Sequence, residues 1–94
     1  MTHKPLNFEQ VEALRKRMLL TTSDMAKLLG VSRQGYYDWR KNNKIRRKRE
    51  DEVRAKIKLL LSVLVDHQWP TPEVIGMEPP QRLERLEALL EELG

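Results

Sequence analysis

The chain has 94 residues, a length that suits one small domain with a modest core. Hydrophobic residues make up 39% of it and charged residues 34%, a balance that indicates a globular fold and not a disordered chain. It contains no cysteine, which excludes disulfides and thiolate metal sites and fits a reducing cytoplasm. No stretch has the length and apolarity of a membrane span, and the first residues lack a signal or lipidation pattern, so we expect no membrane partner.

The net charge of +4 is spread unevenly along the chain. Residues 1–49 carry 13 Lys and Arg against 4 Asp and Glu, whereas residues 50–94 carry 5 against 10. This asymmetry predicts that a polyanion binds at one end only, although an unevenly charged solvated surface would give the same counts. We therefore divide one continuous domain into a candidate nucleic-acid-binding part, residues 1–49, and a helical extension, residues 50–94.

Helical periodicity dominates the sequence, and the first helix is expected over residues 8–19 after a cap at Asn7. Its apolar face is Phe8, Val11, Leu14 and Met18. A second helix begins after a threonine cap, Thr21 or Thr22, and Gly30 supplies the positive-φ residue that ends it. The inward face of this second helix is Met25, Leu28 and Leu29.

A third helix is expected over about residues 33–42, with Ser32 as its N-cap. Its inward-facing residues are Tyr36 and Trp39. Asn42 and Asn43 can end it, because asparagine tolerates left-handed backbone geometry.

A fourth helix should begin near residues 47–50 and reach about residue 67. Its expected core-facing positions are Val53, Ile57, Leu60 and Leu64. Residues 59–65 are apolar on nearly all sides, and such a helix needs burial on all sides. One side can lie on the first three helices, and the other must meet something else.

Two proline breaks divide the remaining chain. Thr71 as a cap and Pro72 as a first residue predict a short turn of helix through Ile75, ended by Gly76. A last helix over about residues 80–93 places leucines at heptad-like spacing, at Leu83, Leu86, Leu90 and Leu93. With fewer than two heptads it must pack on the fourth helix or on a second subunit.

The second and third helices together meet the steric demands of a helix-turn-helix. Such a unit crosses two helices over a short turn, so that the second helix can enter the major groove. It needs a small residue where the helices touch, glycine at the turn and apolar residues toward the core. In this chain those positions are Met25, Ala26, Leu29, Gly30, Val31, Tyr36 and Trp39. All of them fit, so the pattern predicts DNA binding.

The segment TTSDMAKLLGVSRQGYYDWRKN, residues 21–42, resembles the helix-turn-helix of the lambda-repressor-like (Cro-type) family of bacterial and phage regulators. With the preceding helix the likeness covers residues 8–49. It implies an all-α fold, a small helical bundle that binds an operator as a homodimer. Residues 50–94, with their proline breaks, depart from the family's pattern.

A narrower likeness joins GVSRQGYYDWRK and the following RRKRED to the N-terminal helix-turn-helix of some insertion-sequence transposases. Those enzymes need a long catalytic domain with three spaced carboxylates, and this sequence of 94 residues does not include one. The likeness therefore supports DNA binding and argues nothing for catalysis.

The candidate base contacts lie on the expected outer face of the third helix. They are Ser32, Arg33, Gln34, Tyr37 and Lys41. Arg33 suits guanine and Gln34 suits adenine, although both are alternatively ordinary solvated residues. Tyr37 can touch a thymine methyl or a phosphate. Asp38 either accepts a hydrogen bond from cytosine or pairs with Lys41.

The candidate phosphate contacts surround that helix. They are Thr22, Ser23, Arg40, Asn43, Lys44, Arg46 and Arg47. The first two stand at the start of the second helix, where hydroxyl and backbone N–H groups can bind phosphate. The cations over residues 44–49 oppose the dipole of the helix that they begin, which favours a phosphate role over a merely solvated helix start.

The sequence offers little other chemistry. His3 and His67 stand far apart without cysteine, so no metal site is expected. No phosphate loop, catalytic triad or glycine-rich fingerprint is present. We therefore expect no catalytic residue, no cofactor and no enzyme activity.

A homodimer is inferred from the excess apolar surface of the fourth helix and the leucine row of the last. The expected interface residues are Leu59, Leu61, Val63, Val65, Leu86, Leu90 and Leu93. Trp69 either pins the last helix onto the fourth or lies in a partner interface. A dimer would place two third helices about one helical turn apart on an inverted repeat, as in a cytoplasmic, nucleoid-associated repressor.

Two other functions remain open. A protein-interaction module, such as an antitoxin or an adaptor for polymerase or another regulator, would use the helix-turn-helix as a scaffold and grip its partner through residues 50–94. A sequence-tolerant nucleic-acid binder would use the basic run alone. A self-complementary interface favours the homodimer, whereas exposed apolar surface on the isolated chain favours a different partner.

Overall fold

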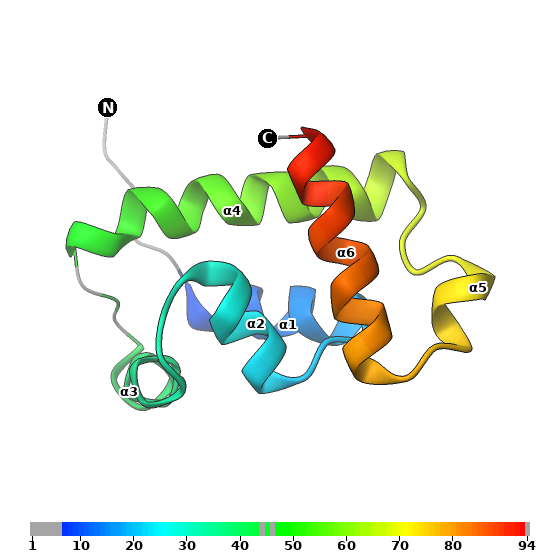
Figure 1. The fold of residues 1–94 in the computed structure, drawn as a ribbon. Coiled ribbons are helices and arrows are strands. Elements are labelled where there is room, and N and C mark those ends of the chain that lie inside the picture. The colour runs from blue at the N-terminus through cyan, green and yellow to red at the C-terminus, as the bar shows by residue number, and fades with distance from the viewer. Residues whose placement is uncertain (1–6, 44, 46, 94) are drawn as a thin grey trace.

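The computed structural model describes residues 7–43, 45 and 47–93, and it is all-helical, without a strand, over these residues (Figure 1). This confirms the prediction of a small all-α bundle. The helices of the described chain are α1 (Phe8–Arg17), α2 (Thr22–Leu29), α3 (Arg33–Asn42), α4 (Arg47–Asp66), α5 (Pro72–Ile75) and α6 (Pro79–Leu93). None of them is long and apolar enough to cross a membrane.

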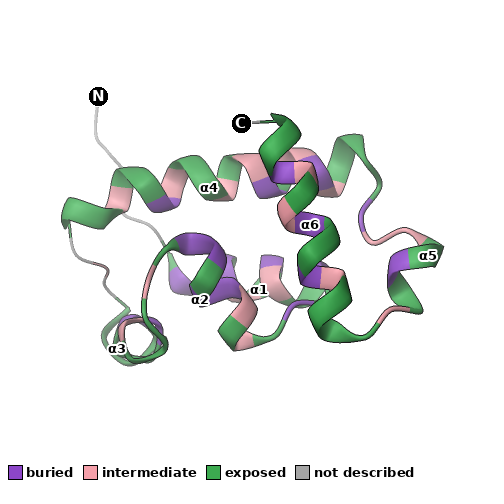
Figure 2. Cartoon of the chain, in the orientation of Figure 1, coloured by how far each residue is buried: buried purple, intermediate pink, exposed green. Residues whose placement is uncertain are grey.

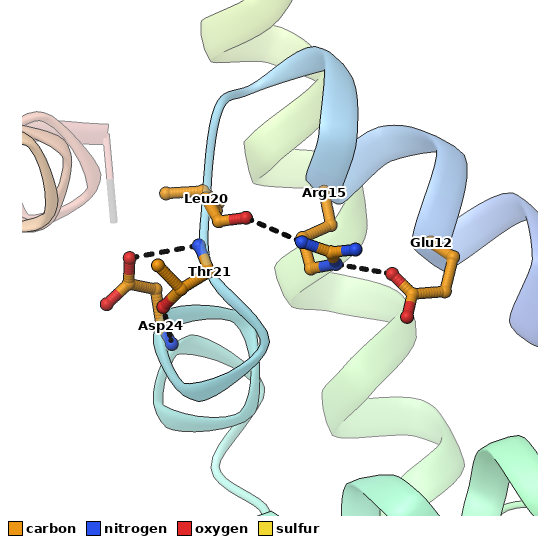
Figure 3. A network of polar contacts seen from close by, with 5 residues as sticks. All are labelled: Glu12, Arg15, Leu20, Thr21 and Asp24. Atoms are coloured by element: carbon orange, nitrogen blue, oxygen red, sulfur yellow. Dashed lines mark hydrogen bonds and ion pairs between the residues drawn. The ribbon is translucent and has the colours of Figure 1, made fainter. Parts of the chain in front are cut away.

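The corner between α1 and α2 is fixed by two local networks of polar contacts (Figure 3). Thr21 is the cap of α2: its hydroxyl accepts a hydrogen bond from the Asp24 backbone N–H at 3.0 Å, and the Asp24 carboxylate accepts one from the Thr21 N–H at 3.1 Å. Arg15 contacts Glu12 and donates to the carbonyl of Leu20 at 2.8 Å. Of the two threonines that the sequence offered as the cap, the structure thus selects the first.

The first helix is shorter than expected because the chain leaves the helical conformation after Arg17. α1 stops at Arg17, and Met18 is its C-cap. Leu19 adopts a positive φ of 60°, which no α-helix can contain, so the expected extension to residue 19 is wrong.

The core is a single cluster to which every helix contributes (Figure 2). α6 packs across the C-terminal half of α4 (Figure 1), and Leu60 and Val63 of α4 and Leu86 and Leu90 of α6 are all buried in the common core. Part of the apolar surface that α4 could not cover with the first three helices is therefore covered within the same chain. Ile57 and Leu64, expected in the core, are only partly buried but pack against it.

This packing corrects the expected partner interface. Val63, Leu86 and Leu90 are core residues of one chain, exposed by 0%, 0% and 7%, so they offer no surface to a partner. Leu59 is partly buried against the same core. The interface residues that stay exposed are Leu61, Val65 and Leu93.

The segment between α4 and α6 is tied back to the end of α1. Trp69 is buried, and its indole N–H donates to the carbonyl of Met18 at 2.8 Å. Arg82, near the start of α6, donates to the carbonyl of Leu19 at 2.9 Å and to that of Met77 at 2.8 Å. The same guanidinium also donates to the carbonyls of Val74 and Ile75 at the end of α5.

Candidate nucleic-acid interface

α2 and α3 are joined by a turn of three residues, 30–32. Gly30 has a φ of 74°, a left-handed conformation that glycine adopts without a steric penalty, as the sequence predicts. Ser32 then caps α3 by accepting a hydrogen bond from the Gly35 N–H at 2.9 Å. A Cβ at Gly35 would lie 3.1 Å from the Ser32 hydroxyl oxygen, so a larger residue there would disturb the cap. Figure 1 looks nearly along α3 while α2 lies across the view, so the two helices cross steeply.

Two aromatic side chains hold α3 against the bundle. Tyr36 and Trp39 are buried, and their rings lie 5.0 and 5.2 Å from the ring of Phe8 in edge-to-face packing. Burial raises the pKa of Tyr36 to about 12, and the negative charge of Glu12 acts in the same direction. The phenol is therefore neutral at physiological pH, and the charged side chains of Glu12 and Arg15 lie near it.

The candidate base contacts all lie on the exposed side of α3 or at its cap. Ser32, Arg33, Gln34, Tyr37 and Lys41 are exposed, as is the candidate phosphate contact Arg40. Because the opposite side of the helix is anchored by the buried aromatic pair, this outer face is held in one orientation. The prediction of an outward-facing set is confirmed for its exposure; its contact with bases stays a prediction.

The outer face of α3 is divided into two stripes along the helix. With about 3.6 residues per turn, a basic stripe follows one side. Its members are Arg33, Tyr37, Arg40 and Lys41. Residues spaced by four form the other side, which we call the amide stripe: Gln34, Asp38 and Asn42.

Asp38 has a partner that differs from both expectations. The side-chain amide of Gln34 donates to a carboxylate oxygen of Asp38 at 3.0 Å, one helical turn away. The expected pairing with Lys41 is thus replaced by a pairing within the amide stripe. A single negative charge stands on the outer face of α3 beside the basic stripe.

A groove of about 510 Å³ runs beside the amide stripe and reaches the first turn of α4. Arg49 lines this groove and donates to the carbonyl of Gly30 at 3.2 Å, and it also lies 3.4 Å from a carboxylate oxygen of Glu52. Its cation sits at the C-terminus of α2, where the helix dipole favours positive charge. Arg49, one of the cations of residues 44–49, therefore stabilises the turn between α2 and α3, a role that the sequence did not predict.

The remaining candidate phosphate contacts differ in how well they are placed. Arg47 is exposed in the first turn of α4, and Ser23 is exposed in the first turn of α2, where Thr22 is partly buried. The Asp24 carboxylate caps the same end of α2, and its negative charge opposes a phosphate there. Lys44 and Arg46 lie outside the described residues.

Asn43 has a structural role that the sequence did not suggest. It ends α3 with a φ of 51°, as predicted, and its side-chain oxygen accepts a hydrogen bond from the Phe8 backbone N–H at 3.2 Å. The bond joins the end of α3 to the start of α1. Only its amide nitrogen is left for the expected phosphate contact.

The charge asymmetry of the sequence becomes a spatial one in the fold. α3 and the first turn of α4 occupy one end of the molecule, and α5 and most of α6 lie toward the other (Figure 1). The outward side of α6 carries three exposed carboxylates, Glu84, Glu91 and Glu92, and a fourth, Glu87, is partly buried 3.6 Å from the Lys27 ammonium of α2. At the α3 end, the outer face of α3 has more cations than carboxylates, whereas the cations that begin α4 are followed directly by Glu50, Asp51 and Glu52.

Comparisons of the chain with protein-family models, with curated proteins and with solved structures find no match. Within the described residues, no group of three His, Cys, Asp or Glu side chains could hold a metal ion. The crossing of α2 and α3 and the exposed side chains of α3 are therefore the observations on which a functional assignment depends.

Proposed function

We propose that this protein binds double-stranded DNA in a sequence-specific way, by placing α3 in the major groove, and that it regulates transcription by occupying an operator. The observation that carries the proposal is the basic stripe of α3, exposed on a helix that crosses α2 over a three-residue turn. This is the arrangement that a helix-turn-helix requires.

The dimensions of the helix and the groove support this proposal. An α-helix with its side chains is about 10–12 Å wide, and the major groove of B-DNA is about 12 Å wide. α3 lies at one end of the molecule with one side free along its length (Figure 1). Arg33, in its first turn, can then donate two hydrogen bonds to guanine, and Tyr37 can meet a thymine methyl.

Cations on both sides of the outer face of α3 would hold the phosphate backbone. Arg40 belongs to the basic stripe, and Arg47 begins the next helix after the loop. Binding at these positions would release counterions from DNA, so affinity would fall as salt rises. The resemblance of residues 21–42 to Cro-type regulators points in the same direction.

A homodimer on an inverted repeat is part of the proposal, with a smaller interface than the sequence suggested. Leu61 and Val65 lie one helical turn apart on α4 and are exposed by 45% and 69%, and Leu93 of α6 is exposed by 42%. Three exposed side chains are few compared with the roughly 800 Å² per partner of a stable interface. We therefore expect the two copies to assemble on DNA, in the cytoplasm and with the nucleoid, more than in free solution.

The same exposed pair supports the second candidate, a protein-interaction module. In that case, Leu61 and Val65 would contact a different protein and α3 would serve only as scaffold. Sedimentation of the protein with and without its selected duplex separates the two: one complex with two copies on one duplex supports the homodimer.

The central experiment is selection of duplexes from a random DNA library, followed by titration at several salt concentrations. Arg33→Ala should relax the preference at one base position, at a cost of about 1–3 kcal/mol for the selected sequence. Arg47→Ala should weaken all sequences and reduce the salt slope by about one ion. Arg85→Ala is the matched control, because it removes an exposed arginine that pairs with Glu73 on α5.

An enriched inverted repeat would support both recognition and dimeric binding. Binding without any enriched sequence would reduce the proposal to a sequence-tolerant contact. Equal effects of Arg33→Ala and Arg85→Ala would remove the assignment of α3 as the reading helix.

A further inference from the structure

Gln34 and Asp38 form a joined pair on the outer face of α3. Both side chains are exposed, they stand one turn apart, and the Gln34 amide nitrogen donates to the Asp38 carboxylate at 3.0 Å. The neighbouring exposed residues on the basic stripe, Arg33, Tyr37 and Lys41, include no other carboxylate. The pair thus places one negative charge on a surface that is otherwise neutral or basic.

The donors and acceptors that this pair leaves free match some DNA bases better than others. An ionised carboxylate only accepts hydrogen bonds, and the bond from Gln34 occupies part of that capacity. The Gln34 amide keeps one N–H and its oxygen. Together the two side chains therefore present several acceptors and a single donor.

The four bases differ in how they match such a surface in the major groove. Cytosine presents its N4 amino group and adenine its N6 amino group, and both donate. Guanine presents only the acceptors N7 and O6, and thymine presents the acceptor O4 beside its methyl group. A carboxylate opposite guanine would leave acceptors facing each other, each without a partner.

We infer that Asp38 is a specificity-determining residue, which holds the Gln34 amide in place and selects a base with an exocyclic amino group, cytosine or adenine, at one position of the site. The inference rests on the proposed function, since it requires α3 to lie in the major groove. Alone, Gln34 would read adenine with the nitrogen and the oxygen of its amide. In this inference, Gln34 and Asp38 contact one base together.

Asp38 also affects binding to DNA of any sequence. Its charge faces the polyanion and repels phosphate oxygens wherever α3 approaches the backbone without the correct base. On the selected sequence the amino group offsets this repulsion. The same carboxylate therefore widens the ratio between specific and non-specific affinity.

The test compares Asp38→Asn with Asp66→Asn in duplex selection and in salt titration. Both variants remove one exposed carboxylate, but Asp66 ends α4, away from α3 (Figure 1). We expect Asp38→Asn to lose the preference for cytosine or adenine at one position, with a roughly five- to hundredfold smaller discrimination against guanine there. Its affinity for random duplex should rise more than that of Asp66→Asn, with a salt slope steeper by at most about one ion.

Gln34→Ala completes the design, because it leaves the carboxylate but removes its partner. It should weaken the preference at the same position, since Asp38 is then no longer held in place. A selected motif that is identical in wild type and Asp38→Asn would overturn the inference while leaving the proposed function intact. A wild-type protein that enriches no duplex would overturn both.

Discussion

α3 and α6 are helices of one bundle that turn opposite charges toward solvent and are held in different ways. α3 is anchored by two aromatic residues, Tyr36 and Trp39, and exposes a basic stripe. α6 is anchored by leucines, with Leu86 at the centre, and exposes a row of glutamates. The buried faces explain why both helices fold onto the bundle, and only the outward faces distinguish what each can bind.

The packing that anchors α3 and the packing that anchors α6 also differ in how their stability depends on pH. Leucine packing contains no titratable group, whereas the aromatic support of α3 includes the buried phenol of Tyr36. The stability of the packing beneath the candidate DNA-binding helix therefore falls at alkaline pH, where Tyr36 ionises. The leucine packing beneath α6 has no such dependence.

The largest expected effect comes from removing the main anchor of α3. Trp39→Ala should lower the free energy of unfolding by about 3–5 kcal/mol, because it leaves a cavity between α3 and Phe8. Tyr37→Ala, on the exposed side of the same helix, should cost about 1 kcal/mol or less. Urea unfolding measures both values. Equal losses would mean that the aromatic pair does not hold α3.

A smaller effect is expected at the anchor of α6. Leu86→Ala should cost about 2–5 kcal/mol as a core truncation, whereas Leu61→Ala, which is exposed, should cost less than about 1 kcal/mol. The measurement is urea unfolding at two protein concentrations, since stability that comes from an interface depends on concentration. A loss of stability for Leu86→Ala that depends on protein concentration would show that Leu86 contacts a second subunit.

The pH dependence gives the third test, which applies to α3 alone. The folded protein retains the Tyr36 proton up to a pKa of about 12, against an ordinary value of 10.0. This contribution to stability is therefore fully present below pH 10 and is lost as the pH rises through 12. Between these values the free energy of unfolding should fall by about 2–3 kcal/mol from this group.

Tyr36→Phe provides the control for the pH test, because it keeps the ring and removes the titrating hydroxyl. Urea unfolding from pH 9 to 12 should show a shallower decline for this variant than for wild type. Parallel declines would show that the phenol titrates normally and is not buried as described.

Features set by neighbouring residues were predictable from the sequence. Thr21 and Ser32 cap helices and Gly30 ends one, because each acts through residues within a few positions in the chain. The exposure of the α3 side chains followed from the helical period once Tyr36 and Trp39 were placed inside. The outer face of the candidate site could therefore be read before the fold was known.

Features that join distant segments could not be predicted in this way. An apolar stripe shows that a helix must be covered, but not whether a second chain or, as for Leu86, the same chain covers it. Asn43 was an expected phosphate contact and Arg49 was one cation of the basic run; their bonds to Phe8 and Gly30 depend on how α1 and α4 lie in the fold. The Gln34–Asp38 pair did have a signal in the sequence, since residues four apart share a helix face.

The bonds from Trp69 to Met18 and from Arg82 to Leu19 have a consequence for the order of folding. They join positions 51 and 63 residues apart, so each contact closes a long loop at an entropic cost and can form only after Trp69 or Arg82 has been made. During synthesis the ribosome releases all of α1, α2 and α3 before Arg82 emerges. The corner that leads into α2 can therefore form its local bonds, between Thr21 and Asp24 and from Arg15 to Leu20, before the rest of the chain is made. Its bonds to Trp69 and Arg82 can be added only when those later residues are available.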